Sequence, residues 1–548
     1  MFTTVARQGV SRSEELDRIA RLPTRGGAIG YDFSPLRAKG GTQALRPIQA
    51  QALGELADTG GLFAPIPVGG GKTLISLLAP AVVGAKRPLL LIPAALRAKT
   101  LADAEGYSAH WAISVPTILS YEKLSRESAA DALELMAPDL IILDECHKAR
   151  RAQAAVTRRL KRYLRKHPET KVVAMSGTIT NRSIHDYAHI LEWCHKERSP
   201  LPRNFPTLQE WSLATDEGPF AIPPGALVEL MDENERKVAS GTAHWGNIGE
   251  MRKAARGAVR RRVAVTPGCL PPEADAIGAS LVLAAWGVSP PEILKRTMAQ
   301  VRRTWCKPDG TPMADAYQVV DCLRTLAVGG YHRWTETPPR AWAEARRVWC
   351  AFVRESLSRS QLDTELQVAN ACRNGKLPDA AWRTWDAVHD TFTPVSEFVW
   401  LSEDIVAAVG RWLKGEPGIV WVDSVAVGQA VSEMHKIPFF SQGGRCGDDS
   451  IMVHSGSCVA SIRACGTGYN LQAFANALVL EPPANGTAWE QLMGRLHRQG
   501  QEADSVRFDV LLWSEEQKKA LDRARSDAAY IFETTGAEQK LLYCDKAL

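Results

Sequence analysis

The sequence lacks any long hydrophobic run, and no apolar stretch approaches the roughly 18 residues that a membrane-spanning helix needs. Its eleven cysteines are scattered and include no CxxC pair. The N-terminal residues contain no apolar stretch of the signal-peptide type. These absences argue against a membrane protein and against a secreted domain held together by disulfides. We therefore expect a cytoplasmic protein with free thiols.

The composition is that of an ordinary globular protein, with 45% hydrophobic and 23% charged residues. A length of 548 residues exceeds what one hydrophobic core usually organises, so two or three domains are expected. The net charge of +5 is small, but the basic residues are unevenly distributed. The placement of charge is therefore more informative than the total.

Short aliphatic runs alternate with helical patterns in two separate parts of the chain. Such runs are typical of strands buried on both faces of a parallel sheet. In the first part they occupy residues 61–66, 88–93, 115–121, 139–145 and 171–177. In the second part they occupy residues 418–424, 436–442, 458–468, 477–483 and 506–513. The stretch between the two parts is rich in Trp, Arg and Pro, has long amphipathic segments and is predicted to be mostly helical.

These patterns predict an α/β protein with two parallel-sheet lobes and a mostly helical insertion between them. The polar N-terminus is expected to add little beyond one short helix. The predicted divisions are an N-terminal extension at 1–40, a first lobe at 41–198, the insertion at 199–395 and a second lobe at 396–548.

A glycine-rich loop follows the first predicted strand in the sequence PIPVGGGKTLISLL, residues 65–78. Its glycines allow backbone N–H groups to turn around a polyphosphate, and the following helix adds a positive N-terminal dipole. Lys72 is placed to reach the phosphates, and Thr73 is placed to hold Mg²⁺. The loop has the short GxGKT form, because Ile66 stands where the longer pattern has glycine. The alternative is a flexible glycine loop beside an unrelated lysine.

Two carboxylates end a buried strand in the sequence PDLIILDECHKAR, residues 138–150. Ligands of a parallel sheet bind at the carboxyl ends of its strands, so these carboxylates are expected beside the glycine loop. Asp144 then suits the Mg²⁺ shell, and Glu145 is placed to orient or deprotonate an attacking water. Carboxylates that are merely solvated at a strand end are the alternative. Cys146 and His147 have no second cysteine or histidine nearby at zinc-ligand spacing, so His147 is interpreted as a relay or packing residue.

A third pattern lies in TAWEQLMGRLHRQGQ, residues 487–501, where Gln491, Arg495 and Arg498 share one helical face. Planar guanidinium groups stabilise the charge on transferring phosphoryl oxygens, an effect worth about 10³- to 10⁵-fold in rate. Both arginines are far along the chain from Lys72 and are expected in the second lobe. A solvent-exposed basic helix is the alternative.

Two dense basic runs are candidates for nucleic-acid contact. Residues 148–166 contain nine Lys or Arg and no acid, and an apolar stripe through Val156, Leu160 and Leu164 predicts an amphipathic helix. Residues 251–262 contain six basic residues. Direct binding to phosphates is one interpretation, and a solvated charged face is the other. The tryptophans of the predicted insertion are interpreted as core residues rather than as base-stacking residues.

The order of these motifs resembles that of the superfamily-two helicases, and within them that of the Swi/Snf-type double-stranded-DNA translocases. The motifs that carry the resemblance are LRPIQ (45–49), GGGKT (69–73), LLLIPAAL (89–96), ILSYEKL (118–124), DECH (144–147), SGT (176–178), VRRRVAVTPGCLPPEA (259–274), SIRACGTGYNLQ (461–472) and QLMGRLHRQGQ (491–501). Two departures are Cys146, where that group usually has Ala or Gly, and Ile179, where it commonly has proline.

The resemblance implies two RecA-like lobes that sandwich ATP and Mg²⁺ between them. It assigns catalysis to Lys72, Asp144, Glu145, Arg495 and Arg498. It assigns nucleotide binding to Arg46, Gln49, Gly69, Gly70, Gly71, Lys72, Thr73, Gly468 and Gln491, and the metal to Thr73 and Asp144. It assigns nucleic-acid contacts to Ala94, Ser120, Tyr121, Arg260, Arg261, Arg262 and Arg463.

The first hypothesis for function is a nucleic-acid-dependent ATPase that moves along double-stranded or branched DNA, with a monomer as the expected state. The second is a DNA or RNA helicase that separates strands. The third, from another class, is an ATP-switched clamp that binds nucleic acid without motor activity.

Overall fold

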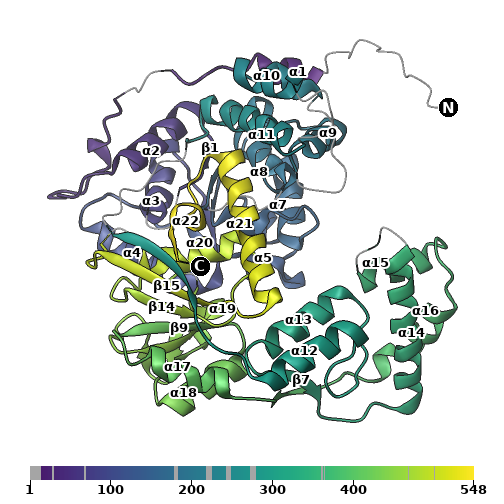
Figure 1. Ribbon diagram of the computed structural model, residues 1–548. Coiled ribbons are helices and arrows are strands. Elements are labelled where there is room, and N and C mark those ends of the chain that lie inside the picture. The colour runs from purple at the N-terminus through teal and green to yellow at the C-terminus, as the bar shows by residue number, and fades with distance from the viewer. Residues whose placement is uncertain are drawn as a thin grey trace. The chain divides into compact units, whose positions relative to one another are not determined.

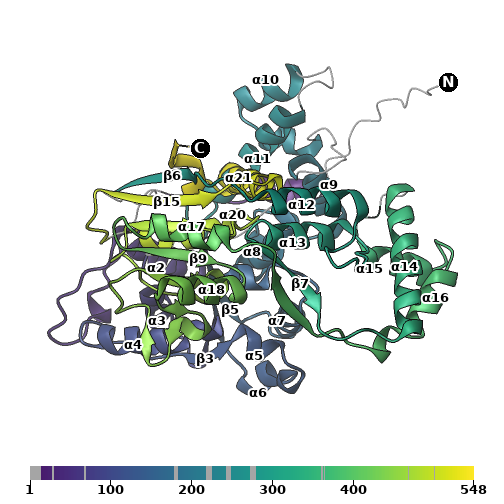
Figure 2. The same cartoon turned by 60° about the horizontal axis from the view of Figure 1, so that its bottom comes forward.

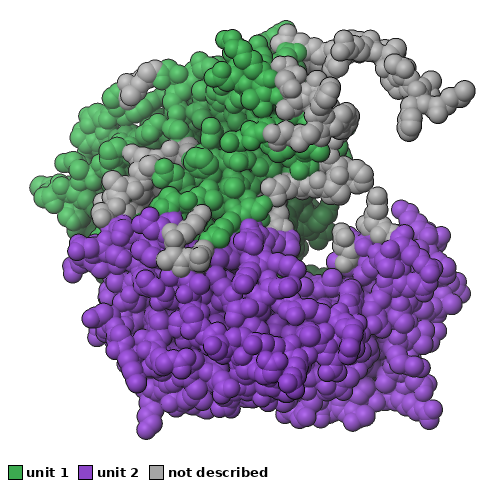
Figure 3. All heavy atoms as spheres, in the orientation of Figure 1, with its two compact units in different colours: residues 1–278, 485–500, 524–543 green, residues 279–484, 501–523, 544–548 purple. Residues whose placement is uncertain are grey.

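The computed structural model describes residues 14–26, 30–66, 70–177, 183–216, 225–241, 248–271, 279–359, 362, 364–466, 468–498 and 500–547. The chain forms two compact units, which Figure 3 colours separately. The first unit comprises Met1–Gly278, Asn485–Gly500 and Ala524–Tyr543. The second unit comprises Ala279–Ala484, Gln501–Arg523 and Cys544–Leu548. The protein belongs to the α/β class, because each unit is built on a parallel sheet.

The sheet of the first unit has five strands, all paired in parallel, in the order β1-β5-β4-β2-β3. The strands are β1 (Leu62–Ala64), β2 (Pro88–Ile92), β3 (Thr117–Ser120), β4 (Leu140–Asp144) and β5 (Lys171–Met175). Each lies within one of the five aliphatic runs of the first part of the chain. The prediction of these strands is therefore confirmed.

Both faces of the first sheet are buried, which explains why its strands are aliphatic without alternation. Ile141 and Leu143 of β4 belong to one hydrophobic core, and Leu140 and Ile142 belong to another. The helices α2 and α3 cover the second of these faces (Figure 1). The helices of this unit are α1 (Glu14–Ala20), α2 (Pro47–Thr59), α3 (Lys72–Val83), α4 (Arg97–Ser108), α5 (Tyr121–Ser125), α6 (Ala132–Met136), α7 (Ala155–Lys166), α8 (Ala188–His195), α9 (Phe205–Thr215), α10 (Glu233–Gly241), α11 (Ile248–Val265), α20 (Gly486–Leu496) and α22 (Lys540–Tyr543).

The sheet of the second unit has seven parallel strands in the order β10-β13-β9-β14-β15-β6-β16. Five of them lie in the predicted runs of the second part: β9 (Gly418–Val422), β10 (Phe439–Phe440), β13 (Cys458–Ser461), β14 (Asn476–Val479) and β15 (Ser505–Leu511). The other two, β6 (Ser280–Trp286) and β16 (Asp545–Ala547), were not predicted. The strand β6 lies in the stretch that was predicted to be an insertion, so that stretch also contributes to a sheet.

Helices dominate the rest of the second unit, as predicted for the middle of the chain. They are α12 (Glu292–Thr304), α13 (Ala316–Leu326), α14 (Arg340–Arg359), α15 (Glu365–Arg373), α16 (Ala380–Asp386), α17 (Asp404–Trp412), α18 (Val425–His435) and α19 (Ile462–Cys465). The helix α21 (Glu515–Thr535) contributes to both units. Figure 2 shows α17 and α18 beside β9, and these three elements share one core. Antiparallel pairs join β7 (Gly330–Trp334) to β8 (Ser396–Trp400) and β11 (Arg445–Cys446) to β12 (Asp449–Ser450).

The tryptophans of this helical region form a core, as predicted. Trp342, Trp349, Trp382 and Trp385 are buried in one cluster. Trp342 meets Trp385 edge to face, with ring centroids 5.0 Å apart. Such edge-to-face pairs stabilise packing beyond the burial of area alone.

The compact units divide the chain differently from the predicted lobes. The first unit continues beyond residue 198, because Trp211 of α9 and Ala255 and Val259 of α11 pack into the same core as the first sheet. The first unit also includes two segments from the C-terminal part of the chain, Asn485–Gly500 and Ala524–Tyr543. A domain boundary drawn from the alternation of strands and helices along the sequence does not show that a later segment packs into an earlier unit.

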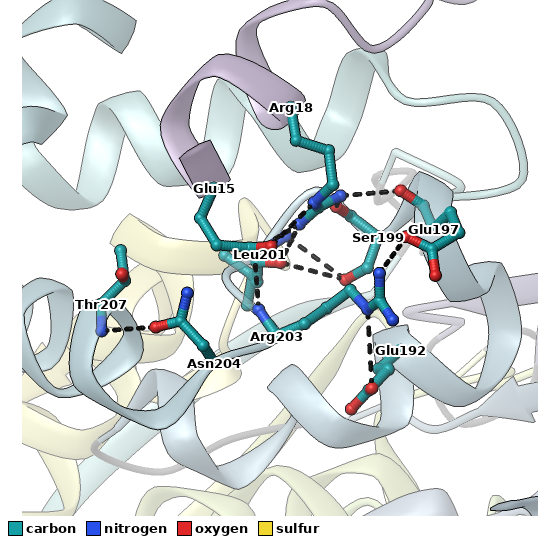
Figure 4. A network of polar contacts seen from close by, with 9 residues as sticks. All are labelled: Glu15, Arg18, Glu192, Glu197, Ser199, Leu201, Arg203, Asn204 and Thr207. Carbon is teal, nitrogen blue, oxygen red and sulfur yellow. Dashed lines mark hydrogen bonds and ion pairs between the residues drawn. The ribbon is translucent and has the colours of Figure 1, made fainter. Parts of the chain in front are cut away.

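The short helix α1 is fixed to the first unit by a polar network around Arg18, which Figure 4 shows. The Arg18 guanidinium donates hydrogen bonds to the carbonyl oxygens of Glu197, Ser199 and Leu201 at 2.7 to 2.9 Å. It also pairs with Glu15 at 2.9 Å. The N-terminal helix is therefore part of the fold of this unit.

Among the described residues, none of the helices combines the length and the apolar character that crossing a membrane requires.

Candidate functional site

The glycine loop leads directly into α3, which begins at Lys72. Gly71 caps the helix in the left-handed conformation, with φ 81°. The positive φ favours glycine here, and a Cβ atom at Gly71 would force the Nε2 end of the Gln49 side chain to move. Gly70 is also described, whereas Gly69 lies outside the described residues. Lys72 and Thr73 thus occupy the first turn of α3, where the helix dipole favours negative charge.

Gln49 connects the start of α2 to the glycine loop. Its side chain is buried, and its Oε1 atom accepts a hydrogen bond of 2.9 Å from the backbone N–H of Arg46. Its Nε2 atom donates to the carbonyl oxygen of Gly71 at 3.2 Å. The structure thus brings together Arg46, Gln49 and Gly71, three residues that the sequence analysis assigned to nucleotide binding.

Lys72 and Glu145 form a buried ion pair at the carboxyl end of the first sheet. The distance from Lys72 Nζ to Glu145 Oε1 is 3.4 Å, and Nζ also donates to the carbonyl oxygen of Ile66 at 3.3 Å. Glu145 follows β4 with φ 58°, a left-handed conformation that is uncommon for a residue other than glycine. This conformation is consistent with a constrained functional position.

The second oxygen of the Glu145 carboxylate is held by Ser176 and His147. The Ser176 hydroxyl, just after β5, donates to Glu145 Oε2 at 3.2 Å, and His147 Nδ1 lies 3.3 Å from the same oxygen. His147 Nδ1 is also 2.9 Å from the Ser176 hydroxyl. His147 therefore contacts the acidic residue directly, while Thr178 and Ile179 of the same motif lie outside the described residues.

The pKa values of the two adjacent carboxyl groups are shifted in opposite directions. Burial, together with the negative charge of Glu145, raises the pKa of Asp144 to about 6. Burial opposes ionisation of Glu145 too, but the Lys72 charge and the His147 hydrogen bond hold the pKa of Glu145 well below its usual range. The lowered pKa keeps Glu145 ionised at neutral pH, as a group that accepts or orients a water proton must be.

Arg495 from α20 lies in the same unit as Lys72 and Glu145, whereas the sequence analysis expected it in the second lobe. Its side chain is buried, and its Nε atom donates to the carbonyl oxygen of Gln491 at 3.1 Å. Burial lowers the pKa of Arg495 to about 10, with the charge of Glu145 acting in the opposite direction and Arg498 in the same direction. The predicted arginine therefore does lie in the electrostatic neighbourhood of Glu145.

The helix α20 is held in this unit by residues that the sequence analysis missed. Asn485 caps its N-terminus by accepting a 2.7 Å hydrogen bond from the N–H of Ala488. The Glu490 carboxylate lies 3.1 Å from Lys540 Nζ and accepts a 2.7 Å hydrogen bond from the Lys540 backbone N–H. The only sequence signal is the position of Glu490 beside Gln491 in the arginine motif, and nothing in the spacing identifies Lys540 as its partner.

Thr73 and Asp144 are the predicted metal residues. Mg²⁺ binds through one or two carboxylates, retains several waters and takes further oxygens from substrate phosphates. A half-buried hydroxyl and a buried carboxyl group fit that requirement. Within the described ranges no cluster of three or more His, Cys, Asp or Glu residues offers an all-protein metal cage.

The predicted nucleic-acid residues of the first sheet have structural partners. The Ala94 N–H donates to Glu122 at 3.0 Å, and Ser120 caps α5 by accepting from the N–H of Lys123 at 3.0 Å. Tyr121 is buried, and its hydroxyl donates to the carbonyl oxygen of Asp144 at 2.9 Å. Tyr121 thus supports the strand end that carries the acidic pair.

The three predicted arginines of α11 are also engaged within the first unit. Arg261 pairs with Asp232 and Glu235, Arg262 donates to the carbonyl oxygens of Leu22 and Pro23, and the Arg260 guanidinium lies 5.9 Å from the Phe532 ring. In the second unit, Arg463 is exposed and pairs with Asp423 at 2.6 Å, and Gly468 has φ 90°. Contact of these arginines with phosphate would compete with their present partners.

The basic helix α7 has the amphipathic arrangement that was predicted. Val156 and Leu160 are buried, and Leu164 is half-buried. Four basic residues of the opposite face are exposed: Arg158, Lys161, Arg162 and Arg165. This exposed basic face of α7 is accessible to a polyanion, whereas the predicted arginines of α11 already have partners within the protein.

Comparison of the sequence with protein-family models and with curated proteins finds no match. A functional assignment therefore rests on the residues and their geometry.

Proposed function

We propose that this protein is a nucleic-acid-dependent ATPase of the superfamily-two helicase type, with RecA-like lobes, that moves along double-stranded or branched DNA. The observation that carries the proposal is the buried pair of Lys72 and Glu145 beside the N-terminus of α3, with Arg495 in its electrostatic neighbourhood. A lysine at a glycine loop, an ionised glutamate and an arginine are the groups that phosphoryl transfer requires.

In this proposal the phosphates of ATP bind at the start of α3. Backbone N–H groups of the glycine loop and the helix dipole favour the negative charge there, and Lys72 reaches the terminal phosphates. Thr73 and Asp144 would hold Mg²⁺, which neutralises charge on the phosphate oxygens. Gln49 fixes the loop through the Gly71 carbonyl and thereby sets the position of Lys72.

Glu145 would orient the attacking water, and its present partners explain how it is prepared for that role. Lys72 keeps the Glu145 carboxylate ionised, and Ser176 fixes its orientation. When Lys72 turns to a phosphate, Glu145 keeps its contacts with Ser176 and His147 and becomes free to accept from water. Arg495 would stabilise the charge that develops on the transferred phosphoryl group.

The track would be bound through phosphates, without sequence preference and with strong salt dependence. The exposed basic face of α7 supports this part of the proposal, because Arg158, Lys161, Arg162 and Arg165 point to solvent on one side of one helix. A solvated basic face remains the alternative role of these four residues.

The ATP hydrolysis rate should be measured with duplex DNA, single-stranded DNA and RNA. We expect stimulation by duplex or branched DNA, and a loss of stimulated turnover of about 100-fold or more in Lys72→Ala and in Glu145→Gln. Lys86→Ala is the matched control, since Lys86 is an exposed lysine near the end of α3. Stimulated turnover that survives in both site variants would refute the site assignment.

A displacement assay separates the motor hypotheses from one another. Displacement of a third strand from a triplex without unwinding of the duplex would support translocation, and unwinding of the duplex would support a strand-separating helicase. Nucleotide-dependent DNA binding without multiple turnover would support the clamp.

A further inference from the structure

The second unit contains a cavity of about 180 Å³ that is remote in sequence from every residue of the proposed ATP site. It lies between α13, the loop before it, the end of β7 and α14. Figure 1 shows α12, α13 and β7 side by side around this region. Its lining includes Lys307, Arg346, Trp334, Tyr317, Asp321 and Thr325. Pockets for drug-sized ligands occupy roughly 300–1,000 Å³, so this cavity suits a single small group.

Lys307 is held over the cavity by a tight loop. Its backbone N–H donates to the carbonyl oxygen of Thr311 at 2.8 Å, and Gly310 closes the turn with φ 87°. Its Nζ atom donates to the carbonyl oxygen of His332 at 2.9 Å and lies 6.0 Å from the centre of the Trp334 ring. Within the described part of the chain, no carboxylate forms an ion pair with Lys307.

Arg346 approaches the same ring from α14. Its guanidinium carbon lies 5.6 Å from the centres of Trp334 and Trp342 and 5.7 Å from that of Trp385. Its Nε atom is buried without a hydrogen-bond partner, and among the described residues no carboxylate pairs with this guanidinium.

Three more exposed arginines of the same region have carboxylate partners, unlike the two cavity cations. Arg333 pairs with Glu397, Arg340 with Glu344 and Arg383 with Asp379. Partly buried cations are ordinarily paired, because burial removes the solvation that stabilises their charge. Lys307 and Arg346 instead converge on the Trp334 ring. Burial lowers the pKa of Lys307, and the charge of Arg346 acts in the same direction, whereas Asp309 and Asp321 act against it.

We propose that this cavity binds a phosphate group. The planar fork of Arg346 and the ammonium group of Lys307 would supply charge-assisted hydrogen bonds to two or more phosphate oxygens. Thr311 and Thr325 also line the cavity. Asp321 also lines the cavity, and because its carboxylate repels a phosphate, both cations are needed to outweigh it.

The phosphate could belong to a nucleic-acid backbone or to a small phosphate compound, and the chemistry of recognition is the same for both. In either case the site lies outside the proposed ATP site and does not depend on it. A backbone phosphate would make this helical region a second point of contact with a nucleic-acid track.

The test uses the full chain and two probes, inorganic phosphate in calorimetric titration and a fluorescein-labelled single-stranded oligonucleotide in anisotropy. The variants are Arg346→Gln and Lys307→Gln, and the matched control is Arg347→Gln, the exposed arginine next along α14. Each variant is also combined with Lys72→Ala, so that phosphate bound at the glycine loop does not contribute. Circular dichroism and the thermal midpoint show whether each variant is folded, and Arg346→Lys keeps the charge where the glutamine variant is unstable.

We expect phosphate binding to weaken about tenfold or more in both cavity variants and by less than about twofold in the control. An equal loss of oligonucleotide affinity would identify a nucleic-acid backbone as the source of the phosphate. A loss confined to inorganic phosphate would identify a small phosphate compound. Cavity variants that bind both probes as well as Arg347→Gln does would overturn the proposal. Basal ATP hydrolysis should stay unchanged in the single variants Arg346→Gln, Lys307→Gln and Arg347→Gln, which keep Lys72, so failure here is distinguishable from failure of the proposed function.

Discussion

The buried ion pair between Glu490 and Lys540 should determine how firmly the arginine helix α20 is held. Both side chains are almost fully buried, at 5% and 6% exposure. Burial alone would lower the pKa of Lys540, but the charge of Glu490 raises it well above its usual range. Each charge therefore depends on the other, and removing one leaves the second uncompensated in the interior.

The expected magnitude follows from this burial. Breaking a buried pair by removing one partner typically costs about 3–5 kcal/mol. Lys540→Met leaves the backbone hydrogen bond from residue 540 to Glu490 in place, but Glu490→Gln leaves a buried ammonium group without its carboxylate. We therefore expect Glu490→Gln to cost at least as much as Lys540→Met, and the double variant to recover part of the loss.

An exposed pair on α21 provides the matched control. Glu515 and Lys519 lie 3.6 Å apart with 69% and 78% of their side chains exposed, so Glu515→Gln should cost about 0–1 kcal/mol. Because a protein with two units need not unfold in one step, amide hydrogen exchange of α20 and α22 is the suitable measurement. Faster exchange in both helices, without a change in β9 or β14, is the expected result.

The reasoning would be refuted if Glu490→Gln exchanged no faster in α20 than Glu515→Gln does. A second readout is ATP hydrolysis, which should fall in Glu490→Gln because Arg495 loses its fixed position on α20. The two readouts separate the structural claim from the functional proposal, since faster exchange with full activity would contradict only the latter.

Three further predictions follow from individual contacts. Gly71→Ala should abolish nucleotide-dependent activity while leaving the fold intact by circular dichroism, because its Cβ atom would collide with Gln49. Arg18→Met removes hydrogen bonds to three carbonyl oxygens and should expose α1 to limited proteolysis, with a loss of stability of about 1–3 kcal/mol. Burial lowers the pKa of His195 to about 3, so between about pH 6 and pH 4 the unfolded chain binds one more proton than the folded chain. The contribution of His195 to stability in urea should therefore fall by about 1.4 kcal/mol per pH unit as the pH drops through this window, and this contribution should be lost in His195→Gln.

The central strands could be predicted because their burial on both faces leaves a continuous aliphatic run in the sequence. Leu140 to Leu143 alternate between two cores, so neither face admits a polar residue. The strand β16 could not be predicted in this way, since it has only three residues, two of them charged, and among the described strands pairs with β6 alone. The strand β6 has an apolar run, but its neighbour β15 lies more than two hundred residues along the chain, and pairing over that distance leaves no local signal.

The acidic half of the candidate site could also be predicted, because parallel strands gather their carboxyl ends at one edge of the sheet. That rule brings Glu145 and Ser176 to the start of α3 without any knowledge of side-chain packing. The position of α20 follows no such rule. The polar contacts that hold it include one buried pair, Glu490 with Lys540, and a hydrogen bond from the Gly486 N–H to Asp527 at 3.3 Å, and its apolar residues are buried as well. Lys540 and Asp527 lie in a later segment of the chain than Glu490 and Gly486, and sequence spacing does not predict these pairs.

The charges around Glu145 would make the proposed site sensitive to the binding of a polyanion. The charges of Lys72 and Arg495 both favour ionisation of Glu145, whereas burial and the negative charge of Glu145 raise the pKa of Asp144. A polyphosphate at the start of α3 would compete with Glu145 for the hydrogen bonds that Lys72 Nζ donates. Loss of the Lys72 partner raises the proton affinity of Glu145, which makes it a better acceptor for a water proton only when the phosphate is present. The same ion pair that stabilises the site without ligand would therefore couple phosphate binding to activation of the glutamate.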